Sequence, residues 1–181
     1  MKKIQVEIEG ATPLLMNSPH MMMEESEKKL KRKTTDYDHK EEAEKVAYRT
    51  EDGKLYVPST AIKGCLINAA SYQKIGKYAA KPIVAGGVRI EPIEIDLGTK
   101  DYKIDLRTVV IQRNRVVKAR PRLDTWKAKF TIVYNENLIG NHDIIRQFLE
   151  EGGERVGILD FSPRNKGEFG TFKVTKWLPV S

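Results

Sequence analysis

The chain has 181 residues, a formal charge of +7 and 40% hydrophobic residues. This length fits a single domain, residues 1–181, with enough apolar side chains for a core, and the excess positive charge favours polyanionic partners. Its one cysteine excludes an internal disulfide and a cysteine-rich zinc site, and no apolar run approaches the roughly 20 residues that cross a bilayer. We therefore expect an intracellular, cytoplasmic protein without membrane contact, in the host cytoplasm if it is viral.

The chain begins with an amphipathic strand and a charged insertion. Ile4, Val6 and Ile8 alternate with polar residues, which predicts a strand at 2–9 with one buried face and not a signal peptide. Residues 17–50 then mix acids and cations with few large apolar side chains. We expect an exposed insertion there, part helical and part mobile, whose charges form a solvated face.

A helix is predicted at 59–73, because Ile62, Cys65, Leu66 and Ala69 recur at helical spacing. Ser59 or Thr60 is its expected N-cap. No acid occurs between residues 58 and 90, whereas five cations do.

The sequence IGKYAAKP after this helix predicts a loop in which Tyr78 lies between Lys77 and Lys81. Such interleaving is common where bases stack beside neutralised phosphates, although ordinary loops show it too. Gly86-Gly87 indicates a turn, and a strand at 88–95, broken at Pro92, is expected to follow.

The most basic stretch is residues 107–122, RTVVIQRNRVVKARPR, with six cations and no acid. Its β-branched residues and a turn near Arg113 to Arg115 predict a β-hairpin. Because a strand projects every second side chain to one face, Lys118, Arg120 and Arg122 would form a row of positive charge suited to a phosphate backbone. The alternative is a solvated edge strand whose cations block pairing.

Two further strands and a helix complete the chain. Alternation predicts a strand at 125–134, with Trp126 and Phe130 in the core. A helix at 141–151 is expected to begin at Asn141 and to end at Gly152-Gly153. A glycine-rich stretch precedes a strand at 169–177, and its glycines would let a backbone approach phosphates closely or would simply form a flexible connector.

Without the insertion at 17–50 and the hairpin, the predicted order is β-α-β-β-α-β. The fold class is therefore α+β, with a ferredoxin-like core of the kind found in RNA-recognition motifs (RRM-like), and two helices covering one sheet face.

No convincing catalytic constellation appears. His20, His39 and His142 lack ligand spacing, so we expect no metal, and the absence of GxxxxGK[ST] gives no support for a P-loop nucleotide site. Cys65 is expected to be a core residue. Asp160 and Glu168 are interpreted as surface charges rather than a catalytic pair. No cofactor is expected.

Several segments carry a resemblance: TPLLMN, YVPSTAIKGCLINAA, ARPRLDTWKAKFTIVY and GGERVGILDFSPRNKGEFGTFKV. They resemble a family of uncharacterised proteins from phages and archaeal mobile elements. The element order and the glycine-rich stretch also resemble the RAMP superfamily, which includes the RNA-lining backbone subunits of CRISPR effector complexes. This second resemblance implies single-strand binding through the sheet side, the hairpin and the glycine-rich loop. The glycine pattern of the RAMP nucleases is incomplete here, so we expect binding without cleavage. In a ribonuclease of this kind, His20 or a Lys near the glycine-rich stretch would act in catalysis.

We therefore expect a non-catalytic, largely sequence-independent binding protein for single-stranded DNA or RNA, which forms a homo-oligomer or filament along the strand. One setting would be phage or mobile-element replication or recombination. The alternatives are a metal-independent RAMP-type endoribonuclease and a structural interaction module. The candidate binding residues are Arg107, Arg113, Arg115, Lys118, Arg120, Arg122, Lys63, Lys74, Lys77, Tyr78, Lys81, Arg164, Lys166, Gly167 and Gly170.

Overall fold

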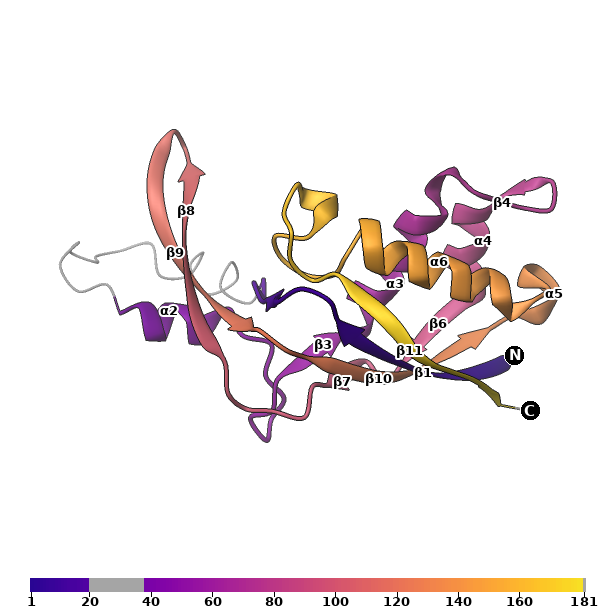
Figure 1. The fold of residues 1–181 in the computed structure, drawn as a ribbon, viewed down its shortest axis with the longest axis horizontal. Helices are drawn as coiled ribbons and strands as arrows, with labels where there is room; N and C mark the ends of the chain where they lie inside the picture. The colour runs from indigo at the N-terminus through magenta and orange to yellow at the C-terminus, as the bar shows by residue number, and fades with distance from the viewer. Residues whose placement is uncertain (20–37, 181) are drawn as a thin grey trace.

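A four-stranded antiparallel sheet with strand order β11-β1-β10-β6 forms the centre of the computed structural model, which describes residues 1–19 and 38–180 (Figure 1). The strands are β1 (Lys2–Gly10), β6 (Val88–Glu91), β10 (Lys127–Tyr134) and β11 (Phe172–Val180). Ile4, Val6 and Ile8 of β1 are buried, as their alternation predicts, and Val6 pairs with Phe130 of β10. Phe130 and Trp126 are both buried in the core, so the predicted face of this strand is confirmed.

Helices cover one face of this sheet (Figure 1). They are α3 (Ser59–Ala69) with the 3-10 turn η1 (Ala70–Tyr72), α4 (Ala80–Gly87), α5 (Glu136–Ile139) and α6 (His142–Arg155). The opposite face carries paired charges: Glu7 lies 3.3 Å from Lys129 and 3.4 Å from Lys176. The hydrogen bond from Lys129 lowers the pKa of Glu7, and both lysines share this one carboxylate.

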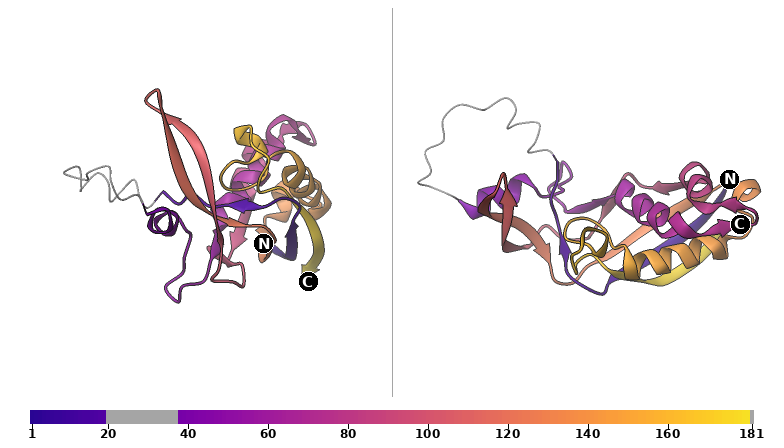
Figure 2. Two further views of the ribbon diagram at one scale, coloured as in Figure 1. Left: turned by 60° about the vertical axis from the view of Figure 1, so that its left-hand side comes forward. Right: turned by 90° about the horizontal axis from the view of Figure 1, so that it is seen from above.

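The basic segment forms a long β-hairpin that projects from one end of the sheet, on the same side as the helices (Figures 1 and 2). It consists of β8 (Lys103–Ile111) and β9 (Asn114–Leu123), and β9 also pairs with β2 (Leu14–Leu15). Its tip is Gln112-Arg113, at φ 48° and 69°, one residue before the predicted turn. Short helix α2 (His39–Lys45), which lies within the insertion, packs against β9.

Smaller elements complete the chain. They are β3 (Tyr56–Pro58), which pairs with β7 (Glu94–Asp96), the hairpin of β4 (Lys74–Ile75) and β5 (Tyr78–Ala79), and the 3-10 turn η2 (Pro163–Asn165). No helix among the described residues is long and apolar enough to span a membrane.

The fold is α+β, and the predicted core elements occur as β1, α3, β6, β10, α6 and β11. The strand expected at 88–95 is two strands, because Pro92 ends β6 and the next three-residue strand turns away to pair with β3. The turn expected at Gly86-Gly87 is the end of helix α4. Its first turn, Ala80 to Pro82, lies in the segment expected to be a loop, and a proline in the first turn of a helix costs no hydrogen bond.

Helix termini are also partly as predicted. The side chain of Asn141 accepts a hydrogen bond from the Asp143 amide and caps α6. The N-cap of α3 is Pro58, which makes no side-chain cap, and not Ser59 or Thr60.

Gly152-Gly153 does not end α6, which continues to Arg155. A Cβ on Gly152 would lie 2.7 Å from the Sγ of Cys65 in α3, and one on Gly153 would lie 2.3 Å from the carbonyl oxygen of Phe172 in β11. These glycines therefore let the helix approach α3 and the sheet closely, which is a packing requirement and not a stop signal.

Replacing Gly153 by Ala is accordingly expected to lower the free energy of unfolding by about 1–3 kcal/mol, because the added methyl group meets backbone atoms that cannot rotate away. The matched control is Gly86→Ala in α4, where a Cβ would meet nothing within 4 Å. There Ala should stabilise the protein by up to about 1 kcal/mol through its higher helix propensity. Urea denaturation measures both changes, and stabilisation of both variants would contradict close packing at Gly153.

Candidate nucleic-acid interface

The glycine-rich segment between α6 and β11, residues 156–171, has an unusual backbone. Three non-glycine residues in it have positive φ: Leu159 at 60°, Phe161 at 54° and Lys166 at 63°. Non-glycine residues rarely adopt this conformation, and they keep it only where the surrounding structure enforces it. The segment is therefore a defined loop and not a flexible connector.

Two of its glycines are required by the loop's own packing. A Cβ on Gly167 would lie 1.9 Å from the carbonyl oxygen of Phe161, and one on Gly170, at φ 73°, would lie 2.0 Å from that of Ile158. We expected Gly167 and Gly170 to admit a phosphate. The structure gives a different reason for them, the close approach of two parts of one loop, and their contact with a ligand stays a prediction.

The loop is attached to the base of the hairpin through Arg107. The guanidinium carbon of Arg107 lies 4.9 Å from the ring centre of Phe161 and 4.5 Å from that of Phe169. Its Nε donates to the buried carboxylate of Asp105, at 2.6 Å. Both distances are within the range of a cation–π contact, so Arg107 is held by two rings and, through its ion pair, by an acid.

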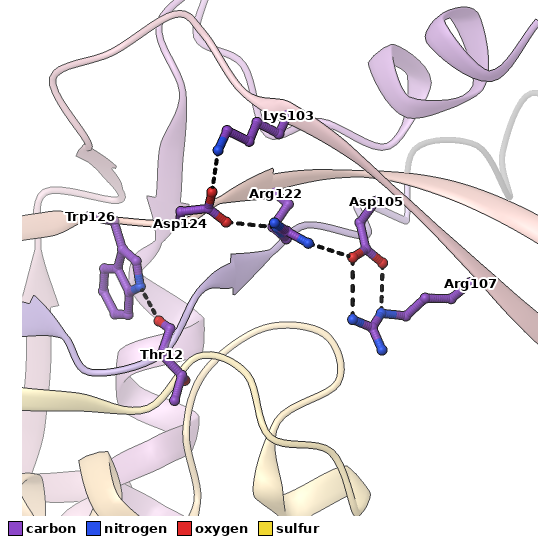
Figure 3. Close-up of polar contacts among 7 residues, drawn as sticks. All are labelled: Thr12, Lys103, Asp105, Arg107, Arg122, Asp124 and Trp126. Carbon is purple, nitrogen blue, oxygen red and sulfur yellow. Dashed lines mark hydrogen bonds and ion pairs between the residues drawn. The ribbon is translucent and has the colours of Figure 1, made fainter.

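Asp105 also binds a second arginine, and Figure 3 shows the resulting chain of ion pairs. Arg122 lies 3.2 Å from Asp105 and 2.8 Å from Asp124, and Asp124 lies 2.6 Å from Lys103. Hydrogen bonds from Lys103 and then Arg122 lower the pKa of Asp124. The three cations at the hairpin base therefore share two carboxylates, those of Asp105 and Asp124.

The rest of the predicted row is matched in the same way. Lys118 lies 3.2 Å from Glu42 of α2, and Arg120 lies 3.0 Å from Asp160 of the glycine-rich loop. Only 13% of the Arg120 side chain is exposed. The predicted row occurs on one face of β9, and each of its cations contacts an acid from another segment, so its contact with a phosphate backbone stays a prediction. Asp160 is likewise an ion-pair partner and not a free surface charge.

Cations without an ion pair lie elsewhere. Arg113 and Arg115 at the hairpin tip are exposed and form no ion pair with any described residue. No ion pair with a described residue is formed either by the other predicted cations on the helical side of the molecule, which are exposed apart from the half-buried Lys63: Lys63, Lys74, Lys77, Lys81, Arg164 and Lys166. The tip and the β4–β5 hairpin lie at opposite ends in every view, so the two basic segments of the sequence do not merge into one patch (Figures 1 and 2).

Two adjacent cavities lie between α3 and the glycine-rich loop, and Arg164 lines both. The first, about 260 Å³, lies between Thr60 and Gly64 of α3 and Gly157 and Ser162 of the loop. A Cβ on Gly64 would meet nothing within 4 Å, so this side of the helix is open. We call the two cavities together the α3 groove.

The second cavity, about 580 Å³, is lined by Asn68, Ser71, Tyr72, Lys81, Arg155 and Arg164. It brings together two predicted residues, Lys81 and Arg164, that are far apart in the sequence. The other four were not among the candidates taken from the sequence. The spacing of Asn68, Ser71 and Tyr72 at i, i+3 and i+4 places them on one helix face, and this signal could have identified them. Tyr78 is exposed on the neighbouring β4–β5 hairpin.

A third cavity, about 680 Å³, lies at the hairpin base and carries balanced charge. Its cations pair with its own acids: Lys127 lies 3.5 Å from Glu9, and Lys103 and Arg122 both contact Asp124. This cavity therefore has no excess positive charge with which to attract a polyanion.

The two described histidines, His39 and His142, and Cys65 form no common site. His142 Nδ1 accepts a hydrogen bond from Trp177 Nε1 at 3.2 Å, His39 begins α2, and His20 lies outside the described residues. Burial raises the pKa of the Cys65 thiol to about 12, so Cys65 is a core residue, as expected. Within residues 1–19 and 38–180, no three His, Cys, Asp or Glu side chains are grouped as metal ligands would be.

Comparison with known proteins gives a structural relationship. No family model matches the sequence, and no curated protein matches it. The chain is similar to a chain in a cryo-EM structure of the type III-B Cmr-beta bound to cognate target RNA, with a TM-score of 0.67 and 16% sequence identity. The match covers 99% of this chain and 61% of that chain, so the fold is shared, and the present chain spans less than two thirds of its neighbour's length.

Proposed function

We propose that this protein is a non-catalytic binding protein for single-stranded nucleic acid, and for RNA in particular. One observation carries the proposal: two of the cations that line the α3 groove, Lys81 and Arg164, form no ion pair with a described residue, whereas the basic row of the hairpin is neutralised. Unpaired cations attract phosphates, because binding releases the counterions that both partners held. A RAMP-like, ferredoxin-like fold is supported by the strand order β11-β1-β10-β6 and by the likeness to a chain of an RNA-bound complex.

In this proposal a strand lies along α3, opposite the glycine-rich loop. Arg164 lies between the two cavities and contacts the backbone from the loop side. Such phosphate contacts fix the position of a strand without reading its bases, so binding is largely independent of sequence. Arg113 and Arg115 add a second contact at the hairpin tip for longer strands.

The open side of α3 provides a direct test. Gly64→Glu should weaken RNA binding by about tenfold or more, because it places a carboxylate in the groove. The fold should persist, since the position is open and Glu is a better helix former than Gly. The matched control is Gly86→Glu, which adds the same charge to another open helical glycine that lines neither cavity of the α3 groove.

Fluorescence anisotropy with labelled homouridine and homothymidine strands, with denaturation curves for each variant, measures these effects. The logarithm of affinity should fall with the logarithm of salt concentration by about 0.7 per phosphate contact. Strands of increasing length report, through cooperativity, whether copies assemble side by side. Equal affinities for the Gly64→Glu and Gly86→Glu variants, or a flat salt response, would refute binding in the α3 groove.

A further inference from the structure

The 580 Å³ cavity at the C-terminal end of the α3 groove has an unusual combination of groups. Four segments meet there: the end of α3 with η1, the start of α4, the end of α6 and the turn η2. Three of its lining side chains are cations, Lys81, Arg155 and Arg164, and none is a carboxylate. Its volume lies in the range of sites for small molecules, about 300–1,000 Å³.

Only one of these cations is held by the protein. Arg155 donates from Nη2 to the carbonyl oxygen of Ala69, at 2.7 Å, and lies 3.6 Å from Glu151. Lys81 and Arg164 form no ion pair with any residue that the structure describes. The two polar neighbours donate to their own helix, Asn68 to Gly64 and Ser71 to Ile67. The surplus charge of the cavity is therefore available to an anion.

An aromatic ring lies at the same place. Tyr72 lines the cavity, yet 93% of its surface is exposed. No described ring stacks on it, and no carboxylate binds its hydroxyl group. An aromatic side chain left in water next to unpaired cations is the arrangement on which a base stacks while its phosphate is neutralised.

We infer that this cavity is a seat for one nucleotide of the bound strand, with the phosphate against Lys81, Arg155 and Arg164 and the base stacked on Tyr72. The inference rests on the proposed function and adds a position at which the base itself contributes to binding. It also assigns binding roles to Tyr72 and Arg155. Stacking does not depend on hydrogen bonds to base edges, so the seat accepts any of the bases.

The test compares a homouridine strand with an abasic ribose-phosphate strand of the same length, both measured by fluorescence anisotropy. Tyr72→Ala should weaken binding of homouridine by about five- to tenfold, in the lower range for stacking on an aromatic ring, and should leave the abasic strand unchanged. Tyr72→Phe should bind homouridine as the parent does. Lys81→Ala and Arg164→Ala should weaken both strands equally and lower the salt slope by about 0.7 each. The charge control is Lys100→Ala, an exposed cation that lines none of the three cavities described above.

Three other results would contradict the inference, each for a different reason. If the parent binds neither strand, the proposed function fails, and the seat fails with it. If the parent binds but Tyr72→Ala changes neither affinity, or lowers both equally, the seat is refuted while strand binding in the groove stands. If free uridine monophosphate at micromolar concentration displaces the strand, the cavity belongs to a free nucleotide, and the seat within the strand is overturned.

Discussion

Replacing Phe130 by Ala is expected to lower the free energy of unfolding by about 3–5 kcal/mol, the usual cost of deleting a buried phenyl ring. Phe130 is 4% exposed, lies in β10 and pairs with Val6 on the face that the helices cover. The loss combines the transfer of apolar surface to water with the cavity that a close-packed core cannot fill. Urea denaturation followed by circular dichroism measures it.

The control for Phe130 is its neighbour Lys129, which points to the opposite face, with 75% of its side chain exposed. Lys129→Ala removes only an exposed ion pair to Glu7 and should cost less than about 1 kcal/mol. Similar stabilities for the two variants would show that the sheet is covered on the other face, and that the aromatic ring is instead a stacking platform.

Replacing Asp105 by Asn is expected to lower the free energy of unfolding by about 2–4 kcal/mol, because it leaves the guanidinium groups of Arg107 and Arg122 without their shared buried carboxylate. Asp105 is 5% exposed, whereas each arginine side chain is 32% exposed, so solvent reduces the loss below that of a fully buried pair. The amide keeps the shape of the side chain, and the change therefore reports the charge. Thermal and urea unfolding measure it.

Asp124→Asn provides the comparison, since Asp124 also binds Arg122 but is 35% exposed. Removing the charge of Asp124 should lower the free energy of unfolding by about 0–1 kcal/mol, as for a surface ion pair. A larger effect at Asp124 than at Asp105 would contradict a buried acid as the centre of the network.

The strands and helices of the core could be predicted because their signals are local. Each signal lies within a short stretch of sequence. The strand is indicated by the alternation of Ile4, Val6 and Ile8, and the helix by the spacing of Ile62, Cys65, Leu66 and Ala69. All of these side chains are buried, as predicted. Glycine carries no such unique signal. Gly152 and Gly153 permit close packing inside a helix, and only the atoms opposite them, from Cys65 and Phe172, distinguish this role from a helix end.

The candidate site was harder to predict because charge neutralisation is not local. The window 107–122 contains no acid, yet Glu42 and Asp160, from either side of it in the sequence, reach Lys118 and Arg120 in the fold. The convergence of Lys81, Arg155 and Arg164 on one cavity depends equally on tertiary structure. Counting cations in the sequence therefore located the basic segments but not the acids that pair with them in the fold.

The central position of β1 has a consequence for how the protein is made. Ile4 pairs with Ile132 on one side and with Pro179 on the other, so both neighbours of the first strand are synthesised long after it. On the ribosome the apolar face of β1 remains uncovered while more than a hundred further residues emerge. Such long-range pairing slows folding and leaves apolar surface of the nascent chain exposed, which promotes aggregation. Growth at lower temperature or with a trigger-factor-type chaperone should therefore raise the soluble yield, and a circular permutant in which β1 directly follows β11 should fold faster.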